Sequence, residues 1–145
     1  MSRLLKASLC FTAAGICAYW GAVFSGAVPV IELVPGYRSW FMSFPIPDFW
    51  IAITSLLAVV LARFDKRLSA IAMAAAGSGL VFLGLYAFAY GFNSGLVYEL
   101  TVDELIEIAI KIYCLTMGAW LLVSAYRQIP GPRKAAPYPP LTAAR

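Results

Sequence analysis

The sequence predicts an all-α integral membrane protein in which four transmembrane helices form an up-and-down bundle. Of its 145 residues, 62% are hydrophobic and 12% are charged, whereas charged residues make up about a quarter of an ordinary soluble domain. Four runs are long and apolar enough to cross roughly 30 Å of hydrocarbon, which takes about 20 helical residues. Most of the basic residues stand at the ends of these runs, which is typical of membrane proteins.

The predicted spans follow one another with short connections, at about residues 7–28, 48–63, 69–90 and 105–126. They form one transmembrane domain, residues 1–127, and residues 128–145 form a basic, proline-rich cytoplasmic tail that we expect to be extended. The first run also has features of a signal peptide. However, no charge interrupts it between Lys6 and Glu32, which favours a span that is retained.

The distribution of charge predicts that both termini face the cytoplasm. In this orientation the inner segments hold nine of the eleven basic residues and one acid, a net charge of +8. The outer segments hold two basic residues and six acids, a net charge of −4. Because Lys and Arg accumulate on the cytoplasmic side, we expect this orientation in a bacterial inner membrane, with the lipid bilayer as the surrounding partner.

The connection between the first and second spans, residues 29–47, is too apolar to be solvated throughout. Its aromatic residues, which continue into the second span, stand at the height of the membrane interface, where such rings are enriched: Tyr37, Trp40, Phe41, Phe44, Phe49 and Trp50. The simplest interpretation is a loop that lies among the lipid headgroups. The alternatives are a lid over a cavity between the helix ends, or a docking surface for a partner.

The third span is expected to be the packing centre of the bundle. Only about five residues link it to the second span, so these two spans should be antiparallel neighbours. Gly77, Gly84 and Gly91 recur every seven residues along it. Small residues let membrane helices approach closely, and this packing replaces the hydrophobic drive that is missing in lipid. We therefore predict that these three glycines lie at helix–helix contacts.

The fourth span begins with the one charged face that enters an apolar run. Thr101 and Glu104 form a capping box, in which the threonine hydroxyl accepts from the amide of Glu104 and the carboxylate reaches back to the amide of Thr101. The helix should therefore begin at about Val102. At about 3.6 residues per turn, Glu104, Glu107 and Lys111 share one face.

These three residues are the leading candidates for a ligand-binding site, because an unpaired charge at mid-membrane costs at least about 2.5–3.5 kcal/mol. Asp48, at the start of the second span, and Arg38, in the preceding loop, could converge with Glu104, Glu107 and Lys111 near the outer surface. The simpler interpretation is that Lys111 snorkels out to the headgroups and forms a surface ion pair with Glu107, since it lies only about 7 Å along the span.

Several kinds of chemistry lack their usual residues. The chain has no histidine, the commonest metal ligand and the usual general base. Cys10, Cys17 and Cys114 lie in apolar runs and form no C-x-x-C pair. We found no glycine-rich phosphate loop, no serine elbow and no basic stripe with stacking aromatics. We therefore expect no metal, no cofactor, no nucleic-acid partner and no catalytic residue.

Three function classes remain. The first is a non-catalytic accessory protein or complex subunit, in a homo-oligomer or a larger membrane complex. The second is a binder or transporter of a small cationic or lipidic molecule through an acidic outward-facing mouth. The third is a membrane-embedded enzyme of the lipid or sterol isomerase type. It ranks last because such enzymes cluster acids inside the bundle, and the acids of this chain are predicted at its rim.

Overall fold

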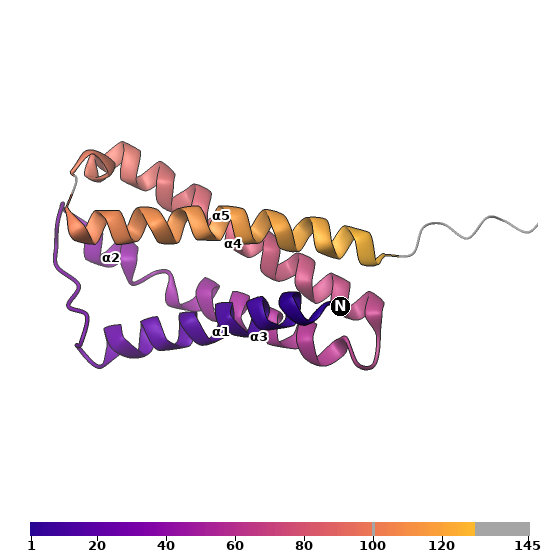
Figure 1. Ribbon diagram of the computed structural model, residues 1–145. Coiled ribbons are helices and arrows are strands. Elements are labelled where there is room, and N and C mark those ends of the chain that lie inside the picture. Colours follow the sequence, from indigo (N-terminus) through magenta and orange to yellow (C-terminus); the bar gives the residue numbers. More distant parts are fainter. Residues whose placement is uncertain (100, 130–145) are drawn as a thin grey trace, which may run out of the picture.

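The computed structural model describes residues 1–99 and 101–129, and the regular secondary structure in this part is all helical (Figure 1). The long helices alternate in direction: α1 (Arg3–Phe24), α3 (Pro45–Leu61), α4 (Lys66–Ser94) and α5 (Val102–Gln128). A short helix, α2 (Tyr37–Phe41), precedes α3, and a 3-10 turn, η1 (Leu96–Tyr98), joins α4 to α5. The tail predicted at 128–145 lies outside the described residues from 130 onward.

The prediction of four helices that could cross a membrane is confirmed. By length and composition the candidates are Arg3–Phe24, Tyr37–Leu61, Lys66–Ser94 and Val102–Gln128. The second candidate is longer than predicted because it includes α2 and begins well before residue 48. Pro45 occupies the first turn of α3, where a missing amide hydrogen costs nothing.

Local capping explains the other boundaries. The Ser2 hydroxyl accepts from the amide of Leu5 at 3.2 Å, so α1 begins at Arg3 instead of residue 7. Gly26 adopts a positive φ of 78°, and the chain turns there before the predicted end at residue 28. The Asp65 carboxylate accepts from the amides of the first turn of α4 and starts that helix before residue 69.

The start of α5 at Val102 is as predicted, but only half of the capping box forms. The Thr101 hydroxyl accepts from the amide of Glu104 at 3.2 Å. The Glu104 carboxylate, predicted to reach back to the Thr101 amide, instead accepts from Lys111 Nζ at 3.0 Å. The Thr101 amide donates to the carbonyl of Glu99 at 2.7 Å. A buried ammonium makes a stronger, charge-assisted hydrogen bond than a backbone amide does, which explains the exchange.

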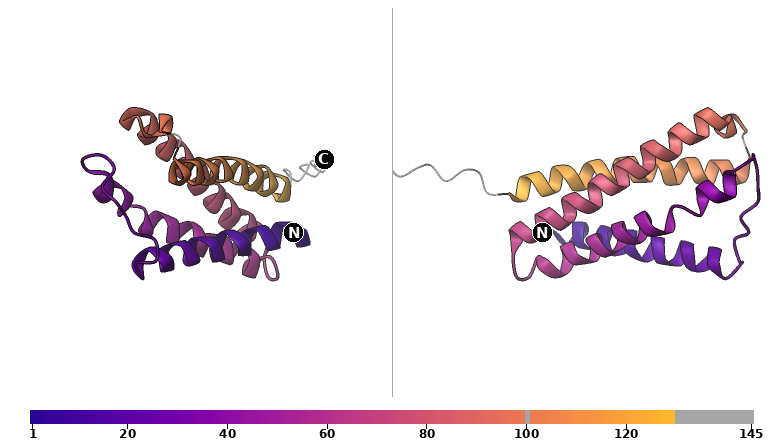
Figure 2. Two further views of the ribbon diagram at one scale, coloured as in Figure 1. Left: turned by 60° about the vertical axis from the view of Figure 1, so that its left-hand side comes forward. Right: turned by 180° about the vertical axis from the view of Figure 1, so that it is seen from behind.

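The four long helices pack in chain order and leave one side of the bundle open. Helix α1 packs on α3, α3 on α4, and α4 on α5 (Figures 1 and 2). Between α1 and α5, every pair of described Cα atoms is more than 8 Å apart. The predicted up-and-down order is therefore present, but the first and last helices do not close the bundle.

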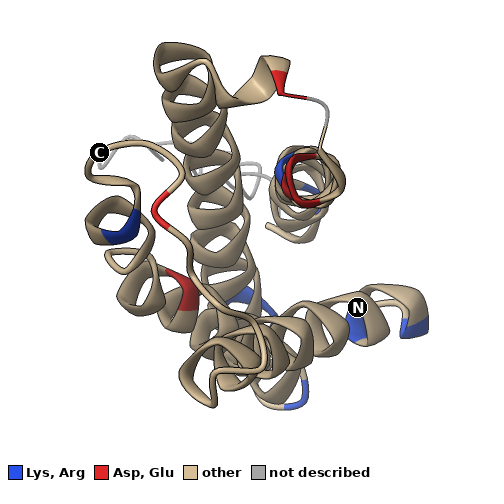
Figure 3. Cartoon of the chain, turned by 90° about the vertical axis from the view of Figure 1, so that its left-hand side faces the viewer, with Lys and Arg blue, Asp and Glu red and all other residues tan. Residues whose placement is uncertain are grey.

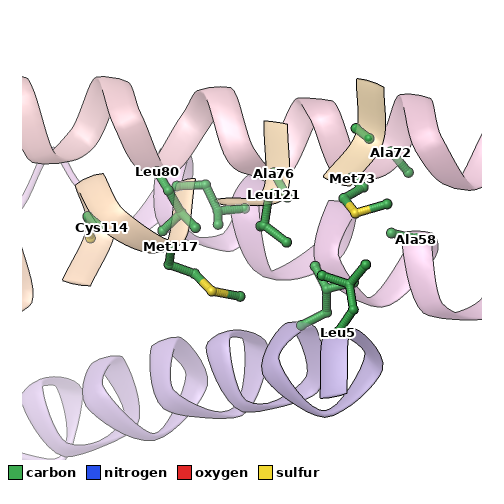
Figure 4. Packing of buried hydrophobic residues seen from close by; sticks show 12 residues of the cluster. Leu5, Ala58, Ala72, Met73, Ala76, Leu80, Cys114, Met117 and Leu121 are labelled. Atoms are coloured by element: carbon green, nitrogen blue, oxygen red, sulfur yellow. The ribbon is translucent and has the colours of Figure 1, made fainter. Parts of the chain in front are cut away.

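A hydrophobic cluster draws on all four long helices and extends from mid-bundle to the end at which α1 begins (Figure 4). Its members are Leu5 and Leu9 of α1, Ile51 and Ala58 of α3, Ala72, Met73, Ala76 and Leu80 of α4, and Cys114, Met117, Leu121 and Ala125 of α5. Since most of these side chains are almost fully inaccessible, this cluster is the core that positions the rest of the bundle.

The three predicted packing glycines lie on the side of α4 that contacts α5 and η1. A Cβ built on Gly77 would lie 2.9 Å from the carbonyl oxygen of Gly118. Cβ atoms on Gly84 and Gly91 would each lie 2.9 Å from a side chain, in α5 and in η1 respectively. Real Cβ atoms do not come so close, so glycine allows the approach of these elements.

The two ends of the bundle differ in charge (Figure 3). One end, where α3 and α5 begin, holds Glu32, Asp48, Glu99, Asp103, Glu104 and Glu107, and we call it the acidic end. Helix α2 lies at the same end. The opposite end, the basic end, holds Arg3, Lys6, Arg63, Lys66, Arg67 and Arg127 together with Asp65.

Candidate functional site

A cavity of about 550 Å³ lies in the half of the bundle nearer the acidic end. Its walls come from α1 and α5, the two helices that do not pack together, and from α4. Helix α2, Phe44 and the first turn of α3 contribute to it at the acidic end. The volume lies within the range of small-molecule sites, which is about 300–1,000 Å³.

Lys111 is the central charged group of the site. Its side chain is buried, with Nζ 3.0 Å from Glu104 Oε1 and 3.2 Å from Glu107 Oε2. The expected snorkelling of Lys111 to the headgroups is therefore wrong. Two carboxylates of its own helix hold the ammonium inside the bundle. Gly91 of α4 lies beside it, and a Cβ there would be 3.5 Å from Nζ, an ordinary van der Waals contact.

Glu107 is also held by the segment between the first two spans. The Tyr37 hydroxyl donates to Glu107 Oε1 at 2.5 Å. The Tyr37 ring is buried and lies against Phe41 and Tyr90, with ring centroids 5.9 and 6.3 Å apart. Gly36, with a φ of 86°, starts α2 just before this tyrosine. The segment predicted as an interfacial loop thus forms a short helix tied to α5 by a hydrogen bond and to α4 by ring contacts.

Asp48 lines the same cavity from the first turn of α3. Its Oδ2 accepts from Trp20 Nε1 at 2.7 Å. Its Oδ1 is buried and has no hydrogen-bond partner in the described part of the chain. Because the helix begins at Pro45, the carboxylate lies near the positive end of the helix dipole, which favours a negative charge.

Arg38 does not join these groups. It is exposed on α2 and borders a separate surface pocket of about 400 Å³ next to the end of α1. The structure therefore brings Asp48, Glu107 and Lys111 to one cavity, with Glu104 joined to them through Lys111. Of the five candidate ligand-binding residues, Arg38 is the one that the fold places elsewhere.

A polar contact links α1 to α5 beside the cavity. The hydroxyl oxygens of Thr12 and Tyr113 lie 2.7 Å apart. Since the Thr12 hydroxyl donates to the carbonyl of Ser8 at 2.9 Å, we assign Tyr113 as the donor in this contact. The ring of Phe11 packs edge-on against that of Tyr113, at 6.4 Å between centroids. Sequence reasoning missed this pair, because nothing in either helix marks the other as its neighbour.

Aromatic rings surround the acidic-end part of the cavity. Tyr19, Trp20 and Phe41 have centroids 5.3–6.3 Å apart. The ring of Trp40 stacks on Tyr90 at 3.8 Å and meets Phe44 at 4.7 Å. The rings predicted for an interfacial belt therefore turn partly inward, and of these Trp40, Phe41 and Phe44 line the cavity.

The described residues contain no group of three or more Cys, Asp or Glu side chains that could hold a metal ion. Comparisons of this chain with protein-family models, with curated proteins and with solved structures found no match. The function must therefore be inferred from the cavity itself.

Proposed function

We propose that the protein binds an amphipathic small molecule or a single lipid within the membrane. The apolar part of the ligand occupies the cavity, and its polar group lies toward the acidic end. A single observation carries this proposal: Asp48, Glu107 and Lys111 converge on one cavity whose other walls are mostly apolar and aromatic. Small-molecule sites combine such walls with a few placed polar groups. This arrangement favours the second of the three function classes.

The open side of the bundle supports a ligand that arrives from the lipid. Helices α1 and α5 both line the cavity, yet their backbones do not pack together. A lipid-soluble molecule would enter between them, past the contact of Thr12 with Tyr113, and would need no aqueous channel. Because the basic end carries most of the Lys and Arg, we place it in the cytoplasm of a bacterial cell, with both termini inside and the cavity in the outer half of the inner membrane.

The other function classes stay predictions. An accessory subunit, in a homo-oligomer or a larger membrane complex, would use the outer faces of the helices. Large apolar side chains cover those faces as they would for lipid alone. An isomerase-type enzyme would need both an acid and a base free to act on substrate, and of the charged groups that line the cavity Glu107 and Lys111 are engaged with each other, which leaves Asp48.

Purification in a mild detergent, followed by extraction and mass analysis of retained molecules, tests the proposed function. Gly15 lines the cavity, and a Cβ there meets no atom within 4 Å, so Gly15→Phe adds bulk at the cavity wall from a position where the first side-chain carbon is free of contacts. Gly21 has equally open surroundings on the same helix but lies outside the cavity, which makes Gly21→Phe the matched control.

We expect the unmodified protein and Gly21→Phe to retain the same molecule, and Gly15→Phe to lose most of it. Equal retention by all three proteins would show that the molecule binds elsewhere and would contradict the proposal. The proposal would also be contradicted if all three proteins were folded and monodisperse but carried only bulk lipid.

A further inference from the structure

We infer that the polar group of the ligand is an organic cation, an ammonium or a related group with apolar substituents, bound beside Asp48 and Glu107. This inference rests on the proposed function and adds the charge of the ligand to it. It follows from three features of the cavity: an imbalance of charge, a positioned carboxylate with an unused oxygen, and a wall of aromatic rings.

The charges around the cavity do not balance. Among the described residues, Lys111 is the one cation that forms ion pairs with Glu104 and Glu107, and it pairs with both. Within the described residues Asp48 forms no ion pair, and its hydrogen bond comes from a neutral indole. Two carboxyl groups therefore share the Lys111 ammonium, and the third, Asp48, has no paired cation among the described residues. In surroundings as apolar as these an uncompensated carboxylate takes up a proton or a cation, so the site is charge-complementary to a cationic ligand.

Asp48 is held in a fixed position. Its partner Trp20 is almost fully buried, and the 2.7 Å hydrogen bond uses only Oδ2. The second oxygen, Oδ1, is shielded from water and has no donor in the described part of the chain. Buried polar atoms are rarely left without a partner. A cationic group in the cavity beside this carboxylate would compensate its charge, and direct contact with Oδ1 requires the carboxylate or its neighbours to move, because that oxygen is closed to water.

The rings next to Asp48 favour a cation over an anion. Tyr19, Trp20 and Phe41 line the cavity as a contiguous cluster, and ring faces attract ammonium groups. An anionic headgroup would instead face Asp48 and Glu107. It would find no free positive charge at Lys111, which is buried and already bound to two carboxylates.

The inference is tested with two probes of nearly the same shape, in dodecyl maltoside micelles at pH 8. Decyltrimethylammonium carries a permanent positive charge, whereas decyldimethylamine oxide carries no net charge. Trp20 and Trp40 both line the cavity, so tryptophan fluorescence reports binding, and calorimetry gives the affinity. We expect the cation to bind about tenfold more tightly than the amine oxide.

Two isosteric variants identify which carboxylate makes the cationic probe bind more tightly than the amine oxide. Asp48→Asn keeps an acceptor oxygen for Trp20, and Glu107→Gln keeps one for Tyr37. Each should lower the affinity for the cation about tenfold and leave the affinity for the amine oxide unchanged. Asp103→Asn is the control, because Asp103 is exposed on the same helix as Glu107 and lies outside the cavity.

The possible failures are distinguishable. Equal affinity for both probes, lost in Gly15→Phe, would overturn the cationic ligand while the proposed function stands. Unchanged cation affinity in both Asp48→Asn and Glu107→Gln would also overturn it, and would mean that protons balance these carboxylates. Binding of either probe that Gly15→Phe does not weaken would count against the cavity and hence against the proposed function.

Discussion

Gly77 of α4 and Gly118 of α5 face each other backbone to backbone. A Cβ on Gly77 would lie 2.9 Å from the carbonyl oxygen of Gly118, and a Cβ on Gly118 would lie 2.7 Å from that of Gly77. No flexible side chain separates the two helices here, so the contact fixes how far α5 is displaced along α4. Two turns toward the acidic end, a Cβ on Gly84 would lie 3.1 Å from the carbonyl oxygen of Lys111. The glycine contacts therefore set the position of the charged face of α5.

Leucine at either partner of the first contact should separate the helices. We expect Gly77→Leu and Gly118→Leu each to lower the free energy of unfolding by about 1–3 kcal/mol or more, because the added side chain meets backbone that cannot move aside. Denaturant titration in detergent, followed by circular dichroism, measures the change. Gly21→Leu is the matched control, since a Cβ there meets nothing within 4 Å. Equal tolerance at all three positions would contradict a packing role.

The hydroxyl of Tyr37 should hold α2 on the bundle. Tyr37→Phe removes the 2.5 Å hydrogen bond to Glu107 and keeps the ring contacts. Hydrogen bonds to charged groups contribute about 1.5–3 kcal/mol, so amide hydrogen exchange across 30–44 should become about tenfold faster or more, with little change in α4. Tyr98→Phe is the control, because Tyr98 is 73% exposed. Identical exchange in the two variants would show that ring packing alone holds the helix.

The contact between Thr12 and Tyr113 should couple α1 to α5. Thr12→Val and Tyr113→Phe each remove one hydroxyl at nearly constant shape, and the double variant removes both. Interhelical hydrogen bonds in membrane proteins average about 0.6 kcal/mol in double-mutant cycles, and we expect a coupling of that order. If the changes in the free energy of unfolding caused by the two substitutions simply add in the double variant, the two hydroxyl groups do not interact.

Features set by nearby residues could be predicted from the sequence. The four helices follow from the length of the apolar runs. The start of α5 follows from Thr101, whose hydroxyl bonds an amide three residues away. The heptad of Gly77, Gly84 and Gly91 marks one face of α4, because a helix repeats its faces over short distances, and a Cβ on each of these glycines would lie 2.9 Å from an atom of α5 or η1.

Features that depend on distant residues could not be predicted. Tyr37 and Glu107 are 70 residues apart in the chain, and no periodicity connects them. The same holds for Thr12 and Tyr113, which are 101 residues apart. Lys111 shows that the position of a residue along a span does not by itself predict whether its side chain reaches the headgroups. Its distance along α5 allowed it to reach the headgroups, but the carboxylates of Glu104 and Glu107 hold it inside.

The proposed orientation has a direct test. In a variant with Cys10, Cys17 and Cys114 replaced by alanine, Ser39→Cys on α2 should react with a membrane-impermeant maleimide in intact cells, because we propose that the acidic end faces outward. Ser2→Cys should react only after the membrane is opened. The reverse pattern would invert the topology. It would also move the cavity to the inner half of the membrane.

Replacing Lys111 should test whether the buried charges compensate one another. Lys111→Met leaves Glu104 and Glu107 in the bundle without a cation, and removal of one partner from a buried ionic group costs about 3–5 kcal/mol. We expect a loss of that order in denaturant titration. Lys66→Met is the control, because Lys66 is exposed at the start of α4, and it should change stability by about 0.5 kcal/mol or less.

The decisive comparison is a variant in which the acids are neutralised as well. Lys111→Met combined with Glu104→Gln and Glu107→Gln removes the whole charged cluster at nearly constant shape, and glutamine still accepts from Tyr37. If uncompensated charge causes the loss, this triple variant should recover most of the stability that Lys111→Met loses. If the lysine stem mainly fills space, methionine replaces it well, and Lys111→Met alone should remain nearly as stable as the unmodified protein. A triple variant that is less stable than Lys111→Met would show that Glu104 or Glu107 has a second cationic partner, and Glu107 would then no longer contribute to the excess negative charge beside the cavity.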